Sequence, residues 1–179
     1  NNQEGLAKAL LEEGEVLKRQ GNLVRAHTLT DESLQIYTRL DQKSGMAYAM
    51  DRLCDILNEQ GEYEHATQIG EQGLQLAQEL DDRIAMGSLM NNLGIIAFAQ
   101  GNYESASTNF RNAEEIYRAN GQRRAVATLA LNLGSVAGQQ GDLDTCHEYF
   151  KNALEEFQAI GERRLISFTF RNLGLVADM

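Results

Sequence analysis

Two cysteines and three histidines are the side chains best suited to catalysis, and two of them, Cys146 and His147, are adjacent. A thiol next to an imidazole could serve as a nucleophile with its general base. On a helix, however, neighbouring residues point about 100° apart and do not face each other. The histidines His27, His65 and His147 lie far apart in the sequence, and none belongs to a HExxH-type metal motif. We expect no catalytic residue, no metal site and no cofactor, and a structural role for both cysteines.

The acidic residues and the glycines form no recognisable reaction centre either. The carboxylate pairs Glu114-Glu115 and Glu155-Glu156 are interpreted as outer charge, and the glycines include no GxxxxGK[ST] phosphate loop. With 26 acidic and 16 basic side chains, the formal net charge is −10. Such a surface disfavours nucleic acid, which is bound largely through cationic contacts, and anionic membranes. A basic or mixed partner is easier to accommodate.

The cysteines indicate a cellular compartment, and the chain ends indicate whether the sequence is part of a longer protein. The two cysteines form no disulfide framework, which favours a reducing compartment, so we expect a cytoplasmic protein. No apolar run reaches the ~18 residues of a membrane-spanning helix. The sequence begins at Asn1, without a methionine, and stops at Met179 inside a periodic segment. We therefore expect it to be a fragment of a larger protein.

A 40-residue interval organises the whole chain. The run Asn-Leu-Gly recurs at 92–94, 132–134 and 172–174. Glycines at the same interval are Gly21, Gly61, Gly101 and Gly141. The turns between repeats are marked by Asp41, Asp81, Gly121 and Gly161. A sequence repeat of this length predicts a stack of equivalent structural units.

Each repeat is predicted to form two helices, because apolar residues recur at helical spacing in both halves. In the third repeat, these helices cover roughly 83–100 and roughly 103–120. Gly101 between them is a candidate left-handed helix stop. Asn102 is a candidate N-cap of the second helix, like Asn22 and Asp142 in other repeats. The absence of proline agrees with long helices joined by short turns.

The residue pattern of the repeat identifies a family. In the third repeat, it is Leu93-Gly94, Ala97, Gly101, Tyr103, Ala106, Phe110 and Ala113. This pattern resembles the tetratricopeptide repeat, although that repeat is commonly about 34 residues long. The longer form with Asn-Leu-Gly is similar to repeats of kinesin light chains, of spindle-orientation adaptors, and of sensor regions in bacterial signal-transduction ATPases and transcriptional regulators.

The resemblance implies an all-α fold, a right-handed solenoid of four helical hairpins plus one extra C-terminal helix. We expect a single domain over residues 1–179. The repeats are placed at 3–42, 43–82, 83–122 and 123–162, with the final helix at 163–179.

The resemblance also implies that the first helix of each hairpin lines a concave face. Four rows of residues at the repeat interval would point into it: Glu12, Arg52, Asn92, Asn132 and Asn172; Leu11, Asp51, Asn91, Leu131 and Arg171; Lys8, Tyr48, Ser88, Thr128 and Phe168; and Glu15, Asp55, Ile95, Ser135 and Leu175. The expected peptide-binding residues among them are Tyr48, Asp51, Arg52, Asp55, Asn91, Asn92, Thr128, Leu131, Asn132, Ser135, Phe168, Arg171 and Asn172.

Within this face, Asn92, Asn132 and Asn172 share one register, although asparagine is a poor residue for a helix interior. An amide can bond the backbone of an extended peptide without reading its side chains, and the resemblance implies this role. The alternative is that these amides bond a neighbouring helix. Arg52 and Arg171 are candidate anion contacts, and Asp51 and Asp55 are candidate cation contacts. A solvated face with internal ion pairs is the alternative for them.

The leading functional prediction is a non-catalytic scaffold that binds a protein or peptide segment, as a regulatory or adaptor module. One alternative is a sensor of a short signalling peptide that controls a linked output domain. Another is self-association into a homodimer through the C-terminal helix, where Phe168, Phe170, Leu173 and Val176 have no following helix to cover them. A hydrolase with an unfamiliar site receives least support.

Overall fold

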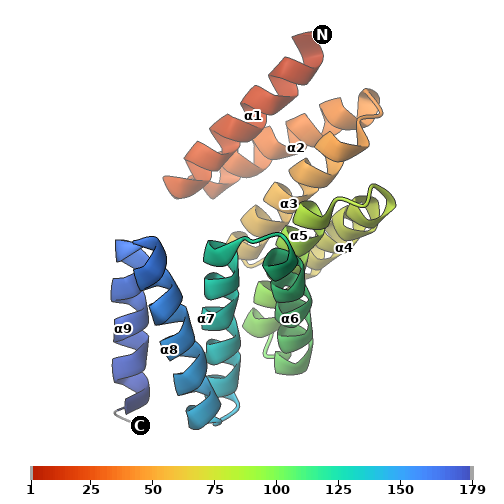
Figure 1. The fold of residues 1–179 in the computed structure, drawn as a ribbon. Coiled ribbons are helices and arrows are strands. Elements are labelled where there is room, and N and C mark those ends of the chain that lie inside the picture. The colour runs from red at the N-terminus through yellow and green to blue at the C-terminus, as the bar shows by residue number, and fades with distance from the viewer. Residues whose placement is uncertain (1, 178–179) are drawn as a thin grey trace. The chain divides into compact units, whose positions relative to one another are not determined.

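The structure is a computed structural model that describes residues 2–177, and side chains for residues 2–173. Within that part the chain forms nine α-helices and no strand (Figure 1). The helices are α1 (Asn2–Arg19), α2 (Leu23–Arg39), α3 (Lys43–Gln60), α4 (Tyr63–Glu79), α5 (Arg83–Ala99), α6 (Tyr103–Ala119), α7 (Arg123–Gln139), α8 (Leu143–Ile160) and α9 (Arg163–Ala177). Each predicted repeat forms two helices, as expected from its two periodic halves.

The turns follow the predicted backbone chemistry. Gly101 has a φ of +77°, in the left-handed region that glycine adopts without a side-chain clash. Asp41 and Asp81 stand at the turns between repeats with φ values of +52° and +49°. Asparagine and aspartate tolerate this conformation better than other residues with a side chain. The repeat therefore closes at the same left-handed position even where glycine is replaced.

The predicted N-caps are confirmed. Asn22 accepts a hydrogen bond from the Arg25 amide, and Asn102 accepts one from the Ser105 amide. Asp142 caps α8 in the same way. Each bond satisfies one backbone N–H group that the first turn of a helix leaves without a partner.

The chain divides into two compact units, Asn1–Ile96 and Ala97–Met179. Unit 1 contains α1 to α4 and nearly all of α5, and unit 2 contains α6 to α9. The prediction of a single domain stays a prediction, as does the handedness of the solenoid.

In unit 1, consecutive helices pack against each other from α1 to α4. The core is built from the apolar stripes of these helices. One cluster joins Leu11 of α1 to Ile36 of α2 and Ala49 of α3. A second cluster joins Leu57 of α3 to Ile96 at the end of the unit. Buried apolar residues of α1, α2 and α3 thus form a core between neighbouring helices of the unit.

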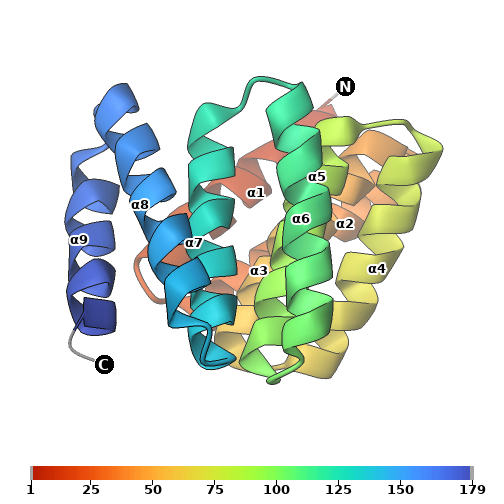
Figure 2. The ribbon, with the colours of Figure 1, turned by 60° about the horizontal axis from the view of Figure 1, so that its bottom comes forward.

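In unit 2, α7 packs between α6 and α8, and α9 packs on α8. Figure 2 shows α7, α8 and α9 side by side. Phe150 and Phe157 of α8 are fully or almost fully buried in the core of this unit. Gly134 on α7 faces Phe150, and a Cβ atom at Gly134 would lie 2.6 Å from Phe150 Cε1. The glycine of the Asn-Leu-Gly run therefore provides the space that an aromatic ring fills.

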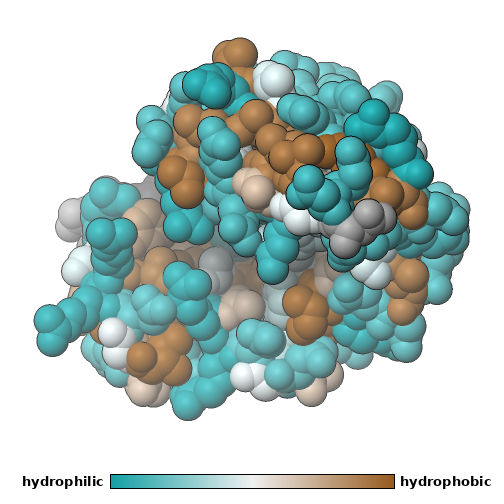
Figure 3. Space-filling view, turned by 90° about the horizontal axis from the view of Figure 1, so that it is seen from above, coloured by the Kyte–Doolittle hydropathy of each residue, from teal (hydrophilic) through white to brown (hydrophobic). Residues whose placement is uncertain are grey.

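The face seen in Figure 3 carries both hydrophilic and hydrophobic residues. Among the exposed apolar side chains are Val24 on α2 and Phe170 on α9. No helix in the part of the chain that the structure describes is long and apolar enough to cross a membrane.

Candidate functional site

The first helices of the repeats in unit 1 lie next to one another, and charged and polar side chains join them. Lys18 of α1 forms ion pairs with Asp55 and Glu59 of α3, the latter at 3.3 Å. Ser88 of α5 donates a hydrogen bond of 2.8 Å to Asp51 Oδ1 of α3. We call the surface that α1, α3 and residues 83–96 of α5 present together the first-helix face of unit 1.

Asp51 is the centre of the connection between α3 and α5. Its side chain is almost fully buried, and it accepts hydrogen bonds from Ser88 and from Asn92 Nδ2, the latter at 2.9 Å. Arg52 pairs with the same carboxylate. Burial raises the pKa of Asp51 above its ordinary value, while Arg52 and Ser88 act in the opposite direction. Three donors thus hold a buried carboxylate between two repeats.

This arrangement shows what Asn92 does within the protein. The amide of Asn92 is buried, and it donates to both the side chain and the backbone oxygen of Asp51. It bonds a neighbouring helix, which is the alternative role considered for the asparagine row. Asp51 and Asn92 are therefore not presented to a ligand, because their polar atoms are engaged inside the unit.

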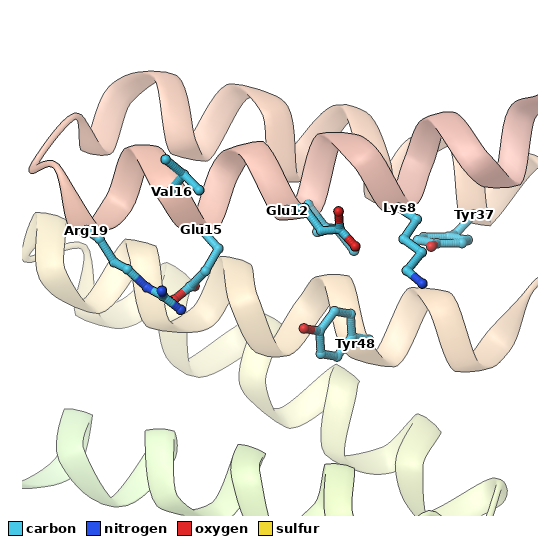
Figure 4. A pocket seen from close by; sticks show the side chains of 8 residues that line it. Lys8, Glu12, Glu15, Val16, Arg19, Tyr37 and Tyr48 are labelled. Carbon is cyan, nitrogen blue, oxygen red and sulfur yellow. The ribbon is translucent and has the colours of Figure 1, made fainter.

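A pocket of about 460 Å³ opens on the first-helix face, between α1 and α3. In Figure 4, Lys8 and Glu12 reach from α1 toward α3, and Tyr48 reaches from α3 toward α1. The complete lining is Lys8, Leu11, Glu12, Glu15, Val16, Arg19, Tyr37 and Tyr48. This mixture of apolar surface with a few polar groups is typical of ligand pockets.

Two residues of the predicted list shape the α3 side of this region. Tyr48 is 55% exposed, and the guanidinium carbon of Arg52 lies 5.3 Å from the centre of its ring. Arg52 also bonds Asp51 and lies 4.0 Å from a carboxylate oxygen of Glu15. Arg52 is therefore held by two carboxylates and an aromatic ring. Asp55, a candidate cation contact, is already paired with Lys18.

In unit 2, the predicted residues fall into two groups. Leu131 is buried in the core between α7 and α8, so its side chain is not presented to a ligand. The hydroxyls of Thr128 and Ser135 donate to backbone oxygens one turn earlier on α7, at 3.0 Å and 2.9 Å. Asn132 on α7 is half-buried, as is Asn91 on α5 of unit 1.

On α9, Arg171 is exposed, and its guanidinium carbon lies 5.1 Å from the centre of the Phe168 ring. Phe168 itself is 43% exposed, and Asn172 is half-buried. This pair repeats the arginine–aromatic contact seen at Arg52. The side chains of Leu175 and Val176 lie outside the described residues.

Both cysteines are free and buried, in agreement with their predicted structural role. Burial, followed by the nearby charges of Asp51 and Asp55, raises the pKa of the Cys54 thiol to about 12. Burial also raises the pKa of Cys146. Among the described residues, no group of three histidine, cysteine, aspartate or glutamate side chains is arranged to hold a metal ion.

Three lining residues of the pocket were not in the predicted rows. Val16 and Arg19 lie on the last two turns of α1, and Tyr37 comes from α2, a second helix. The repeat register pointed only to first helices, so it had no signal for Tyr37. Lys8, Glu12 and Glu15 stood in the rows but not in the final list of contacts.

Comparison with known proteins settles the family. The family described as the MalT-like TPR region matches residues 1–130 of the chain. The chain belongs to this family. Among curated proteins, none matches the chain.

Solved structures similar to the chain have the same fold. BtubC (BKLC) from P. vanneervenii matches with a TM-score of 0.85 and 21% identity, over 98% of this chain and 73% of that protein. Aspartyl phosphate phosphatase F from Bacillus subtilis matches with a TM-score of 0.89 and 15% identity, over 98% of this chain and 46% of that one. A signal transduction ATPase with numerous domains and a tetratricopeptide repeat sensor, from Pyrococcus horikoshii, has a TM-score of 0.81 and 14% identity.

That last match covers 97% of this chain but 27% of the ATPase. At these identities the likeness shows the fold alone. The fold class is the predicted one, an all-α solenoid of tetratricopeptide-type hairpins.

Proposed function

We propose that this MalT-like TPR region binds a peptide or a segment of a protein as the regulatory or adaptor part of a larger protein. The binding surfaces would be the first-helix face of unit 1 and, in unit 2, the surface of the first helices α7 and α9; we call these together the first-helix faces. The observation that carries the proposal is the pocket between α1 and α3. Its volume of about 460 Å³ lies in the range of ligand pockets, about 300–1,000 Å³. It opens where the repeats present their first helices.

The half-buried amides of the face support recognition of a peptide backbone. An asparagine amide has two donor hydrogens and two acceptor lone pairs. Asn91 and Asn132 are half-buried on the first helices, and each already has a contact within the protein. The open aromatic rings of Tyr48 and Phe168 offer apolar area for ligand side chains.

A regulatory setting is supported by one of the similar structures. The repeats of the Pyrococcus horikoshii ATPase are named as a sensor within a protein of several domains. By analogy, the ligand would act on an output domain elsewhere in the larger protein.

Selection from a displayed library of random peptides on the 179-residue chain tests the proposal. We expect peptides whose affinity falls about tenfold in Tyr48→Ala or Asn132→Ala, which corresponds to about 1.4 kcal/mol. Glu115→Ala, an exposed change on the second helix α6, is the matched control and should leave affinity unchanged. If selected peptides are insensitive to both face variants and sensitive to Glu115→Ala, the first-helix faces are not the binding surface.

Thermal melting of Asn132→Ala separates the two roles considered for the asparagine row. Loss of peptide binding with an unchanged melting temperature supports ligand contact. A large loss of stability with retained binding assigns Asn132 to internal packing, as observed for Asn92.

The exposed rings of α9 favour a second candidate function, self-association. Phe168 and Phe170 are 43% and 53% exposed on the last helix. A second copy of α9 could cover them and remove apolar surface from water. Light scattering at several concentrations tests this candidate, since a strict monomer at all of them excludes it. Phe170→Ser should abolish any dimer that forms through these rings.

A further inference from the structure

We infer that the pocket between α1 and α3 takes the side chain of an arginine from the bound peptide. This inference rests on the proposed function and adds the chemistry of one subsite to it. The wall formed by α1 supplies carboxylates, and the wall formed by α3 supplies an aromatic ring (Figure 4).

Glu12 is the carboxylate that would receive the guanidinium group. It is exposed, and it forms no hydrogen bond or ion pair with any described residue. The neighbouring Glu15 differs, because it bonds Arg19 at 3.0 Å and lies 4.0 Å from Arg52. In Figure 4, the Glu12 side chain points into the space between α1 and α3, on the same side as Tyr48. The pocket therefore contains one carboxylate whose acceptor capacity is unused.

Tyr48 is the ring on which the guanidinium group would stack. The Arg52 guanidinium already packs 5.3 Å from its centre, so this ring already accepts a cation. More than half of the side chain stays open, at 55% exposure, and this leaves ring area for a second planar group. Tyr37 adds a further aromatic wall on the α2 side of the pocket. Aromatic rings attract cations and not anions to their faces.

The charge of the surrounding unit favours the same ligand. Residues 1–96 contain sixteen acidic and eight basic side chains, so unit 1 has a formal charge of −8. Such an excess raises the local concentration of cationic groups near the pocket. Arginine is favoured over lysine because its planar group combines stacking on a ring with paired hydrogen bonds to a carboxylate.

Lys8 distinguishes an arginine ligand from an anionic ligand in the same pocket. Its ammonium group also lines the pocket, and it has no partner among the described residues. For an arginine ligand, Lys8 is a repulsive neighbour that can turn toward solvent. For an anionic ligand, it would be the anchor. Removing its charge therefore changes the affinity in opposite directions in the two cases.

The test uses N-acetyl-arginine amide as the probe, with the uncharged isostere N-acetyl-citrulline amide as its control. Both are titrated into the ¹⁵N-labelled chain while backbone amide resonances are followed. We expect the arginine probe, and not citrulline, to shift amides of α1 near Glu12 and of α3 near Tyr48. Glu12→Gln should lower the affinity for the arginine probe about fivefold. Glu13→Gln, an exposed neighbour outside the pocket lining, should leave its binding unchanged. Lys8→Gln should tighten binding about twofold or more.

Equal shifts with citrulline, shifts confined to other helices, or weaker binding in Lys8→Gln would each overturn the inference. The larger peptides selected in the library experiment provide an independent readout. If they bind on the first-helix faces but tolerate citrulline in place of every arginine, the arginine subsite is rejected and the proposed function stands. If the fragment binds as expected and no peptide is selected, the proposed function fails, and the pocket is a site for a guanidinium group that is not part of a bound peptide.

Discussion

Replacement of Asp51 by alanine should lower the free energy of unfolding by about 2 kcal/mol, because it removes the acceptor that joins α3 to α5. The carboxylate receives hydrogen bonds from Ser88 and Asn92, and it pairs with Arg52. All of these donors would lose their common partner. No other side chain of the described part bonds to Asn92.

The magnitude follows from the exposure of each donor. Asn92 is 8% exposed, and in Asp51→Ala its amide keeps only the longer bond, 3.3 Å, to the backbone oxygen of residue 51, so loss of the 2.9 Å side-chain bond costs about 1–2 kcal/mol. The half-buried Ser88 hydroxyl can turn toward water and adds less. Arg52 has 27% of its side chain exposed, so in Asp51→Ala its guanidinium group can bond to water while it keeps its contact with Tyr48. The loss of its ion pair therefore adds little to the loss of stability. The buried carboxylate itself no longer has to be desolvated, which offsets part of the total.

Urea unfolding followed by circular dichroism measures the effect, and a double-mutant cycle isolates the contact. Asn92→Ala alone should cost about 1 kcal/mol, since Asp51 keeps its other donors. The double variant should be more stable than the sum of the single effects predicts, with a coupling of about 1 kcal/mol. Glu71→Ala, an exposed change on α4, is the control and should stay within about 0.5 kcal/mol of the wild type.

Two results would contradict a stabilising contact between α3 and α5. One is unfolding of Asp51→Ala at the wild-type urea concentration, and the other is simple addition of the Asp51→Ala and Asn92→Ala effects. Either result would mean that the buried amide finds another partner, and that the bond between these repeats contributes nothing to stability.

The remaining predictions concern glycines and thiols. Gly134→Ala should destabilise by about 1–3 kcal/mol, because the new methyl would lie 2.6 Å from a ring atom of Phe150; Gly5→Ala, with open space around it, should be neutral or stabilising, and thermal melting compares the two. Cys54 and Cys146 should react with Ellman's reagent at neutral pH only after unfolding in guanidinium chloride, so fast reaction of the native protein would contradict their burial. Burial raises the pKa of Cys54 from its ordinary value of 9.0 to about 12 in the folded protein. Its contribution to stability is therefore fully present below about pH 9 and is lost as the pH rises from 9 toward 12. Between about pH 9 and 11, the wild type should therefore lose about 2–3 kcal/mol more stability than Cys54→Ala, measured by urea unfolding.

Local structure was readable from the sequence, because it depends on residues close together along the chain. The repeat interval located every helix pair, since helical periodicity needs only one side of a helix to be apolar. The left-handed turn at Gly101 and the cap at Asn102 were predicted for the same reason: a turn needs a residue that tolerates positive φ, and a helix start needs a side-chain acceptor. These requirements involve neighbours a few residues away.

The register on the first helices was predicted only in part. Of the predicted contacts, Tyr48 and Phe168 are exposed, whereas Leu131 and Asp51 are buried. Sequence spacing gives the direction in which a side chain leaves its own helix. Whether that side chain reaches solvent depends on the helix that packs beside it. For Asp51, the decisive neighbour is α5, whose Asn92 and Ser88 meet it across the repeat boundary.

The location and the lining of the pocket depend on tertiary structure alone. Tyr37 belongs to a second helix and Tyr48 to the next repeat, so only the packing of α1, α2 and α3 brings them around Glu12. The division of the chain between Ile96 and Ala97 has no counterpart in the repeat pattern, because it reflects how contacts are distributed in space. By itself, the sequence determined the fold family, the helix boundaries and the turns, which follow from local periodicity and backbone preference. The folded structure decided which polar groups are consumed inside the protein and which remain for a ligand, because burial is a property of contacts between distant segments.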